Sequence, residues 1–450
     1  MSRKLMVIGL DAAPPKLIYE EFKDQLPTIA KLIDDGERAE LKSTHPPITI
    51  PAWASMVTGK TPGELGMYGF RHKKPKSYTD FYIANSKFIR KPTIWEIASR
   101  KGLKSIVVGV PPSYPPKPLN GLMISCFITP SSKSQYTYPP QLKSEIEGLF
   151  GPYIFDVIFR TEARDQLIKD LWKMTRYHFK ILKYLANRQW DFFMFVEIGV
   201  DRVQHAFWGF MDKDHHKYKP GNKYERVILE YYKLIDEELS QLLKSIPKNT
   251  AVMLVSDHGA KRMKGAFCVN QWLADKGYLR ILKKPEKPGV DLNKVEIDWS
   301  KTIAWGWGGY YARIFLNVKG REVKGVIKKE DYEHYRDELA EEIMKIRGPN
   351  DEKWNTKVYK PEELYPEVNG DPPDLIVYFD DLYWRSAGTL GWNTMYLREN
   401  DKGPDDAVHD WNGIITIYDP EKTVKLRKHV INITEVFNIM RQLLELEDEA

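Results

Sequence analysis

Four short and almost wholly apolar segments recur along the first two thirds of the chain. They are Leu5–Leu10, Ser105–Val110, Phe192–Ile198 and Ala251–Ser256. Short apolar runs bounded by turn residues or helical patterns are typical of strands buried on both faces of a parallel sheet. The pattern therefore predicts a parallel core sheet that contains these four segments.

Segments whose apolar positions follow a helical period lie between these runs. They are Leu26–Asp34, Thr93–Lys101, Ala163–Asn187 and Tyr224–Leu243. Strands that alternate with helices predict an α/β fold with a mostly parallel central sheet, helices on both faces and right-handed crossovers. Further along, Pro373–Phe379 and Gly413–Tyr418 are predicted strands, and Ile433–Leu444 is a predicted closing helix. Pro111–Pro140 is rich in proline and serine, and we expect it to be a surface excursion.

One segment, Asn270–Asp406, is much longer than an ordinary connection between two elements. It contains a strand-like stretch, Tyr310–Val318, and a helical one, Tyr332–Ile346. A segment of this length with elements of its own is expected to be a structured insertion. The expected division is a core at residues 1–269 and 407–450 and an inserted cap region at residues 270–406.

Composition narrows the class of protein. The chain has 450 residues, and 68 Lys and Arg against 62 Asp and Glu leave a net charge of +6. This excess is too mild to indicate a nucleic-acid partner, but it favours an anionic substrate.

No run approaches the roughly 18 apolar residues of a membrane span. The two cysteines, Cys126 and Cys268, form no disulfide framework, although a single bridge between them stays open. We expect a cytoplasmic protein.

Carboxylates and histidines follow the predicted strands. Asp11 ends the first apolar run, Asp201 and His205 follow the third, and Asp257 and His258 end the fourth. In open α/β sheets, ligands bind beyond the carboxyl ends of the strands, so these side chains are expected to converge. A set of Asp and His without cysteine suits Zn²⁺, Mn²⁺ or a similar divalent ion.

Each of these residues has a simpler interpretation. An Asp after a strand is often a turn residue or a helix cap, and Asp11 alone would fit that role. The i, i+4 spacing of Asp201 and His205 aims both side chains in one direction, which favours a shared ligand. Four other histidines lack such a context and are expected to be ordinary surface or packing residues; they are His45, His72, His178 and His334. His215 and His216 lie in the polar loop Lys213–Lys223 and are expected to be solvated, although they could approach a substrate.

Five motifs, in order along the chain, carry a resemblance to a known family. They are GLDAAP at Asp11, the segment Ser43–Phe70 with its TIPAW, EIGVDRVQHAFW at Asp201, VSDHG at Asp257 and AVHDWNG at His409. With these motifs the chain resembles the alkaline phosphatase superfamily, in particular its type I phosphodiesterase/nucleotide pyrophosphatase branch. The most similar members are archaeal and bacterial proteins described as predicted phosphohydrolases or phosphomutases.

The resemblance implies a two-metal site, with Zn²⁺ the first choice of ion and Mn²⁺ the second. One ion would be held by Asp11, Thr49, Asp257 and His258, and the other by Asp201, His205 and His409. The hydroxyl of Thr49 matches the nucleophile of the family. It would take the phosphoryl group of a small phosphate mono- or diester and form a phosphothreonine intermediate.

The resemblance also leaves alternatives open. Nucleotide pyrophosphatases have an Asn where this chain has Ala52 or Trp53, and a His where it has Leu65.

Other functions also stay open. A phosphomutase would return the phosphoryl group from Thr49 to the same substrate. A metal-stabilised binding protein without turnover is a third possibility. The sequence leaves the oligomeric state open. Sulfatase activity is disfavoured, because no CxPxR-type motif surrounds either cysteine.

His409 follows the insertion and would return the chain to the metal site. The insertion would then be tethered at both ends beside the phosphoryl group and would select the leaving group. Candidate contacts are Trp305, Trp307, Tyr310, Tyr311 and Arg313, for most of which a buried aromatic cluster is the alternative.

Overall fold

The computed structural model describes residues 3–446 and contains a nine-stranded central sheet. The strand order across it is β20-β2-β19-β9-β1-β8-β5-β6-β7, and β9, β1, β8, β5 and β6 run parallel to one another. The strands are β1 (Leu5–Leu10), β2 (Glu37–Lys42), β5 (Ser105–Val108), β6 (Gly121–Ile124), β7 (Thr137–Tyr138), β8 (Phe192–Glu197), β9 (Ala251–Val255), β19 (Asn412–Tyr418) and β20 (Val430–Asn432). The predicted α/β class with a mostly parallel sheet is confirmed.

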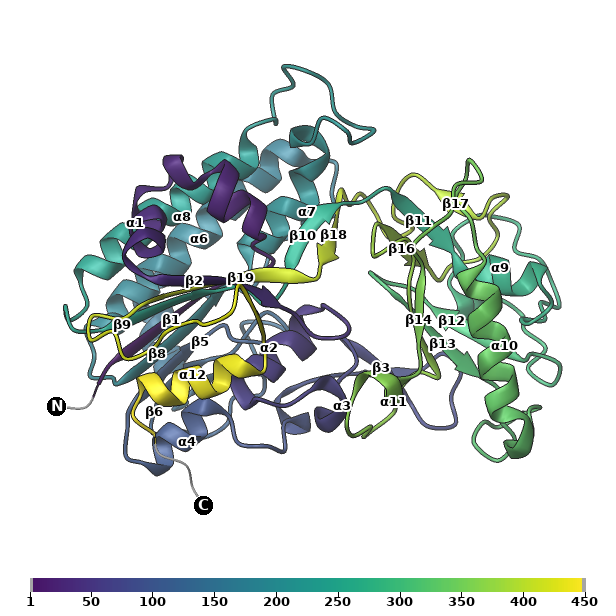
Figure 1. Ribbon diagram of the computed structural model, residues 1–450, viewed down its shortest axis with the longest axis horizontal. Coiled ribbons are helices and arrows are strands. Elements are labelled where there is room, and N and C mark those ends of the chain that lie inside the picture. Colours follow the sequence, from purple (N-terminus) through teal and green to yellow (C-terminus); the bar gives the residue numbers. More distant parts are fainter. Residues whose placement is uncertain (1–2, 447–450) are drawn as a thin grey trace.

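Helices cover both faces of this sheet (Figure 1). Successive side chains of β1 point to opposite faces of the sheet, so that Met6 and Ile8 belong to one apolar cluster and Leu5 and Val7 to the other. The first cluster packs against α1 (Pro27–Asp35), α6 (Arg164–Ala186), α7 (Gly199–Met211) and α8 (Val227–Lys244). The second packs against α2 (Thr49–Thr58), α4 (Ile94–Arg100) and α12 (Glu435–Leu443).

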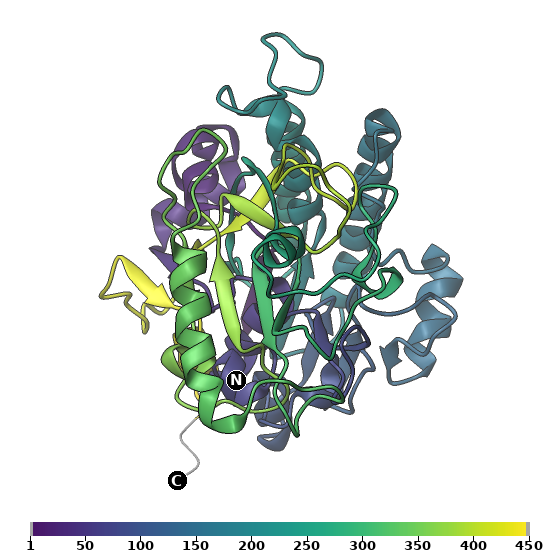
Figure 2. The ribbon, with the colours of Figure 1, turned by 90° about the vertical axis from the view of Figure 1, so that its right-hand side faces the viewer.

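A second, smaller body stands beside the core, on the right of Figure 1 and facing the viewer in Figure 2. Its antiparallel sheet has the order β12-β13-β15-β14 and packs with α9 and α10 around a separate apolar cluster. A three-stranded sheet, β16-β11-β17, adjoins it. The elements are α9 (Val269–Asp275), β11 (Gly265–Cys268), β12 (Ala304–Trp307), β13 (Ala312–Leu316), α10 (Tyr332–Met344), β14 (Lys357–Tyr359), α11 (Pro361–Leu364), β15 (Leu375–Tyr378), β16 (Trp384–Ala387) and β17 (Tyr396–Leu397).

The two bodies are joined by an antiparallel ribbon and by a segment of the core that reaches across. The ribbon consists of β10 (Gly259–Arg262) and β18 (Ala407–Asp410). The reaching segment contains α3 (Pro62–Leu65), β3 (Arg71–Lys73) and β4 (Phe81–Ile83), and the Tyr68 hydroxyl within it donates to the carbonyl of Asn369. The remaining elements are α5 (Gln141–Phe150) and the short helices η1 (Lys16–Glu21), η2 (Lys23–Gln25), η3 (Ser86–Phe88), η4 (Leu292–Lys294) and η5 (Lys329–Asp331).

The structure differs from the sequence-based expectation in two places. Pro111–Pro140 is not only a surface excursion, because β6 and β7 within it extend the central sheet. The apolar run in β6 is four residues long, which is too short to stand out in the sequence. β11 lies before the expected start of the insertion, yet its partners are β16 and β17 of that insertion. The expected division of the chain stays a prediction.

Across residues 3–446, no helix combines the length and the apolar character needed to span a bilayer.

Gly9 allows α2 to approach the middle of the central sheet. A Cβ atom at this position would lie 2.6 Å from the Trp53 ring, 2.8 Å from the Val196 side chain and 2.9 Å from the Phe195 carbonyl oxygen. Contacts this short require neighbouring atoms to move. Gly9 therefore sets the distance between β1 and the helix that begins at Thr49.

We expect Gly9→Ala to destabilise the protein by about 1–3 kcal/mol, because the added methyl group overpacks the core. The matched control is Gly148→Ala on the exposed side of α5, where an added Cβ meets no atom within 4 Å. That change should stabilise the helix by about 0.5–1 kcal/mol. Urea denaturation measures both, and equal midpoints for the two variants would contradict the close approach.

Candidate active site

Two groups of buried carboxylates and histidines lie at the carboxyl edge of the parallel strands. In the first, the ligand atoms of Asp11, Asp257 and His258 lie within 4.8 Å of one another. Asp11 follows β1, and Asp257 and His258 follow β9, its parallel neighbour. Because neighbouring parallel strands end at the same edge of a sheet, the three side chains meet there.

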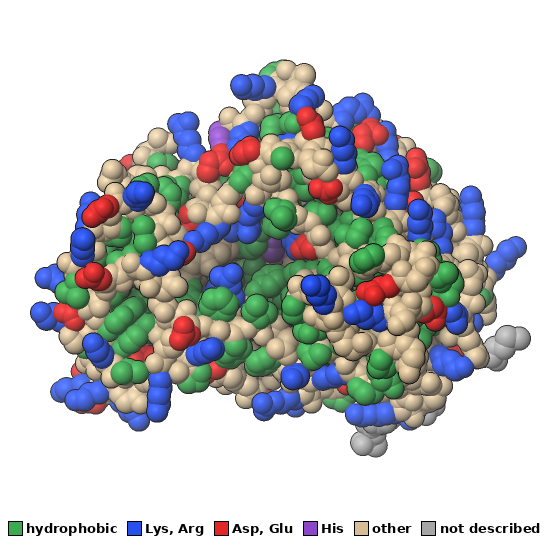
Figure 3. Space-filling model, turned by 180° about the vertical axis from the view of Figure 1, so that it is seen from behind, with side chains coloured by type: hydrophobic (Ala, Val, Ile, Leu, Met, Phe, Trp, Pro, Cys, Tyr) green, Lys and Arg blue, Asp and Glu red, His purple; other side chains and the backbone are tan. Residues whose placement is uncertain are grey.

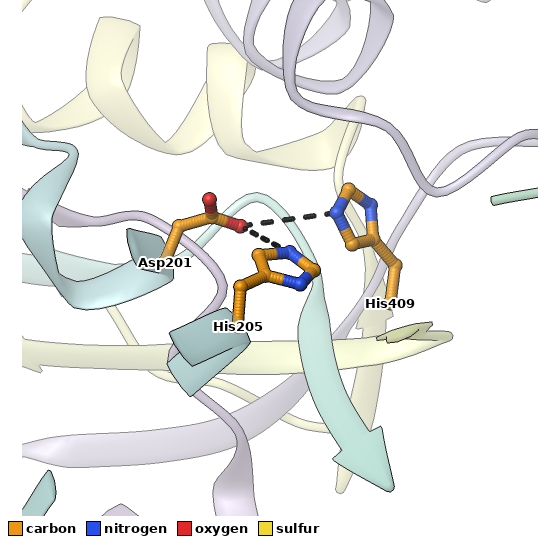
Figure 4. Close-up of side chains that lie close together, drawn as sticks. All are labelled: Asp201, His205 and His409. Carbon is orange, nitrogen blue, oxygen red and sulfur yellow. Dashed lines mark ion pairs between the residues drawn. The ribbon is translucent and has the colours of Figure 1, made fainter. Parts of the chain in front are cut away.

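The second group combines one turn of a helix with a strand from the end of the chain (Figure 4). Asp201 and His205 lie on α7, and His409 lies on β18. Asp201 Oδ1 is 3.1 Å from His205 Nε2 and 3.8 Å from His409 Nε2. The i, i+4 spacing on α7 therefore directs both side chains at His409, as the sequence predicts for Asp201 and His205.

The ribbon of β10 and β18 brings the two groups together. Ala260 lies opposite His409 in this ribbon, and His258 directly precedes β10, so the two histidines lie side by side. Their rings stack with centroids 3.8 Å apart and an angle of 16° between the ring planes. The chain thus leaves the site after His258 and returns to it at His409, with the smaller body built from the residues between them.

Each of the three histidines is held by its Nδ1 atom, which donates to an oxygen. His205 donates to Asp405 Oδ1 at 2.7 Å, His258 to the carbonyl of Gly259 at 2.9 Å and His409 to the carbonyl of Pro47 at 2.7 Å. A neutral imidazole with its proton on Nδ1 presents a lone pair on Nε2. The Nε2 atoms face the carboxylates, which is the arrangement of metal-ligating histidines.

The three carboxylates are held in a similar way, each by one oxygen. Trp53 Nε1 donates to Asp11 Oδ2 at 2.7 Å, the Ala12 N–H donates to Asp257 Oδ1 at 3.1 Å, and an Arg202 guanidinium nitrogen donates to Asp201 Oδ2 at 2.6 Å. The other oxygens of Asp201 and Asp257 are buried without a hydrogen-bond donor. Buried carboxylate oxygens without donors are costly unless a cation compensates them.

The electrostatics of the site also favour a cation. Burial and the neighbouring carboxylate raise the pKa values of Asp11 and Asp257 well above the usual value for Asp. Burial lowers the pKa of His258 to about 4 and holds the pKa of His409 well below its usual value, so both rings are neutral at pH 7. Carboxylates that repel one another beside neutral imidazoles are the donor set of a Zn²⁺ or Mn²⁺ site.

In the second group Asp201 and His205 pair with each other, and despite burial the pKa of Asp201 lies well below and that of His205 well above its usual value. A divalent ion there would take the place of the His205 proton, so the donor types of both groups fit such ions.

Thr49 lies beside the first group, as the first residue of α2. Its Oγ1 atom is 3.4 Å from Asp11 Oδ1 and 3.4 Å from His258 Nε2. The N–H groups in the first turn of a helix have no acceptor within the helix and favour anions. The hydroxyl thus lies between candidate metal ligands and a helix N-terminus. All seven predicted site residues have exposed fractions of 3% or less.

Tyr310 and Asp405 complete the surroundings of His205. The Tyr310 hydroxyl is 3.1 Å from His205 Nε2, and the Tyr310 ring stacks on His409 with centroids 3.9 Å apart. Asp405 is fully buried. No local signal marks Asp405, because its partners lie far away along the chain.

The other proposed cap contacts face the interior of the smaller body or its junction with the core. Trp305 is buried and donates to the carbonyl of Tyr78. Tyr311 donates to the carbonyl of Tyr68, and Arg313 donates to the carbonyl of Arg71. Trp307 packs against Phe315 and Phe81. For these four residues, the aromatic-cluster alternative is the better description.

The histidines outside the site are mostly packed. His45, His72 and His178 are partly or fully covered, and His178 pairs with Glu197 at 3.0 Å. His215 was expected in a solvated loop, but it is buried and stacks on His216.

Seen from behind, the surface is hollowed where the two bodies meet, and a histidine is visible at the bottom of the hollow (Figure 3). Lys and Arg side chains gather around its edge (Figure 3). Positive charge around a hollow favours an anionic ligand.

Comparisons with known proteins identify a family and several similar folds. A family model described as type I phosphodiesterase/nucleotide pyrophosphatase matches residues 5–405. The structure of phosphonoacetate hydrolase from Sinorhizobium meliloti in complex with phosphonoacetate has a TM-score of 0.63, with 14% identity over 98% of this chain and 96% of that one.

The structure of an inactive threonine-to-alanine variant of murine ectonucleotide pyrophosphatase/phosphodiesterase 5, in complex with AMP, has a TM-score of 0.58. Its identity is 14%, over 99% of this chain and 96% of that one. At such identities the likeness concerns the fold. A search of curated proteins finds no match.

We expect the protein, purified without chelators, to contain about two divalent ions per chain. His409→Ala should lower this to about one, because it removes a neutral imidazole from the second group. His334→Ala is the control, since that side chain is 77% exposed on α10. Elemental analysis by mass spectrometry gives the ratio, and unchanged metal content in His409→Ala would remove His409 from the site.

Proposed function

Since the chain belongs to the type I phosphodiesterase/nucleotide pyrophosphatase family, we propose that it is a two-metal phosphohydrolase that cleaves a small phosphate mono- or diester. The observation that carries the proposal is the position of Thr49. Its hydroxyl lies 3.4 Å from both Asp11 and His258, two members of the first ligand group, and at the start of a helix.

The ligand assignment follows the two groups. Asp11, Thr49, Asp257 and His258 would hold one ion, and Asp201, His205 and His409 would hold the other. Zn²⁺ is the first choice and Mn²⁺ the second, because both accept imidazole and carboxylate ligands. Bound in this way, two divalent ions act as Lewis acids that lower the pKa of a hydroxyl and stabilise charge on phosphoryl oxygens.

Thr49 would act as the nucleophile. Its Oγ1 gives up a proton to the solvent and forms a bond to phosphorus, while the bond from phosphorus to the leaving oxygen breaks and that oxygen takes up a proton from the solvent; the product on the protein is a phosphothreonine. A water molecule then attacks phosphorus, releases phosphate or a phosphomonoester and regenerates the hydroxyl. The free N–H groups in the first turn of α2 would donate to phosphoryl oxygens in both steps. The inactive threonine-to-alanine variant of the murine neighbour is consistent with this role.

The substrate is proposed to be a small phosphorylated molecule. The neighbours bind AMP and phosphonoacetate, both of which are small and anionic. Trp53 donates its indole N–H to Asp11, so it is not free to bind a phosphoryl oxygen, and Ala52 has no polar side-chain atom. This favours a substrate other than the nucleotide diesters of the pyrophosphatases.

A phosphomutase is the second candidate, and the burial of the site favours it. All seven site residues are 3% exposed or less, and exclusion of water protects a phosphothreonine from hydrolysis.

We also propose a cytoplasmic location. Cys126 and Cys268 are both buried and unpaired, and free thiols are typical of a reducing compartment.

We expect Thr49→Ala to abolish turnover of para-nitrophenyl phosphate and of its bis ester, because the hydroxyl that receives the phosphoryl group is lost. Thr49→Ser should retain measurable turnover. Thr58→Ala, which lies at the other end of α2, is the control for changes in the helix.

Three outcomes would change the proposal. Turnover at the wild-type rate in Thr49→Ala would remove Thr49 from the mechanism. If the wild-type protein releases nitrophenol from neither ester but isomerises a sugar phosphate or a phosphoglycerate, the mutase replaces the hydrolase. If no product forms in any of the three assays, the protein is better described as a metal-stabilised binding protein without turnover.

A further inference from the structure

An unbalanced cluster of charge lies where the smaller body meets the core. Its centre is the buried carboxylate of Asp405, which accepts from His205 Nδ1 through Oδ1. The other oxygen, Oδ2, accepts from two arginines, Arg160 at 3.0 Å and Arg385 at 2.5 Å. One carboxylate thus faces two guanidinium groups and an imidazole.

Arg385 is held in place, but one of its hydrogen-bond donors has no acceptor. It lies on β16 and is 4% exposed, and its guanidinium carbon lies 4.2 Å from the centre of the Tyr310 ring. One nitrogen donates to Asp405, whereas the buried Nε atom has no acceptor. A buried guanidinium nitrogen without an acceptor is costly, so an anion placed there would be stabilising.

Arg160 forms the more open side of the cluster. It lies between α5 and α6, its side chain is 28% exposed, and one of its nitrogens lies 3.0 Å from the Tyr310 hydroxyl. The guanidinium also packs over the Phe159 ring. Arg160 is therefore anchored through Asp405 and Tyr310 while part of it faces solvent.

Two further acidic residues, Asp156 and Asp406, pair with other cations. Asp156 accepts from Arg202 through both oxygens, and Asp406 accepts from Lys217 at 2.6 Å. Both are thus engaged with cations of their own. The cluster of Arg160, Arg385 and Asp405 keeps one positive charge in excess.

The cluster lies next to the proposed reaction centre. Tyr310 bridges the two, with its hydroxyl 3.0 Å from an Arg160 nitrogen and 3.1 Å from His205 Nε2. Asp405 provides a second bridge, since it binds both arginines and the Nδ1 atom of His205. A substrate bound at the second ligand group would lie beside Tyr310, which contacts both His205 and His409.

We propose that Arg160 and Arg385 form a subsite for a second anionic group, a carboxylate or a phosphate, on the leaving group of the substrate. Guanidinium groups bind both anions with paired, charge-assisted hydrogen bonds. The inference rests on the proposed function, and it narrows the substrates to phosphate esters with a second acidic group.

The test uses three ligands with one scaffold and no ester bond, so binding is measured without turnover. They are propylphosphonate, 3-phosphonopropionate and ethane-1,2-bisphosphonate, which carry a methyl, a carboxylate or a phosphonate at the same position. Calorimetric titration of the metal-loaded protein should show about ten- to hundredfold tighter binding of at least one acidic ligand than of propylphosphonate. The acidic ligand that binds more tightly identifies the natural group.

Arg160→Gln and Arg385→Gln should each reduce this preference about tenfold or more, since each removes a charged donor. Arg188→Gln, which changes an arginine paired with Glu145 on the surface, is the matched control and should keep the preference. If the arginines only orient His205 through Asp405, all three ligands weaken together and the preference persists. That result, or equal affinity for the three ligands in the wild-type protein, would overturn the subsite.

The same design separates the subsite from the proposed function. Preferred binding of an acidic ligand, lost in both arginine variants, supports the subsite even if no phosphate ester is turned over, in which case the hydrolase proposal fails. Turnover of propyl phosphate and 3-phosphonooxypropanoate with equal kcat/KM overturns the subsite and leaves the hydrolase proposal in place.

Discussion

Three carboxylates, those of Asp11, Asp201 and Asp257, are buried close together at the carboxyl edge of the parallel sheet. Burial and mutual repulsion make this arrangement unfavourable unless positive charge compensates it. The surrounding structure supplies part of this charge and fixes the geometry. Arg202 holds one oxygen of Asp201, while Trp53 and the backbone hold the others. The remaining oxygens converge with three imidazole nitrogens on positions suited to cations.

The core fold accounts for the precision of this site. Strands β1 and β9 are parallel neighbours, so Asp11 and Asp257 lie at matching positions just beyond the ends of the two strands. Gly9 lets Trp53 pack on β1, and the indole N–H of Trp53 then reaches Asp11. The same helix begins at Thr49, so one packing contact positions both a ligand and the proposed nucleophile. Rigid elements thus place the reacting groups, as preorganised catalysis requires.

The smaller body approaches the site through a few side chains rather than through its whole surface. Tyr310 contacts His205 and His409, and Arg385 contacts Asp405. Because the chain enters and leaves this body through the ribbon of β10 and β18, its position is linked directly to His258 and His409. The specificity of the proposed reaction would then depend on the same junction that completes the second ligand group.

Local sequence patterns were sufficient to predict the core strands and to identify five candidate ligands. Buried strands appear as apolar runs, and the polar residues that follow them lie within a few positions of those runs. Asp11, Asp257 and His258 follow apolar runs, and Asp201 and His205 share one face of a helical turn. Family motifs were needed for Thr49 and His409, which no pattern of strand ends or helical spacing marks.

The tertiary structure alone decided the rest. β2 is polar and alternates in burial, and β6 has four residues, so neither could be recognised before its pairing was known. The stacking of His258 on His409, the burial of Asp405 and the approach of Arg160 and Arg385 to Tyr310 join residues far apart in the chain. These contacts depend on how β10 pairs with β18 and on how two separate bodies meet, and local periodicity carries no information about either.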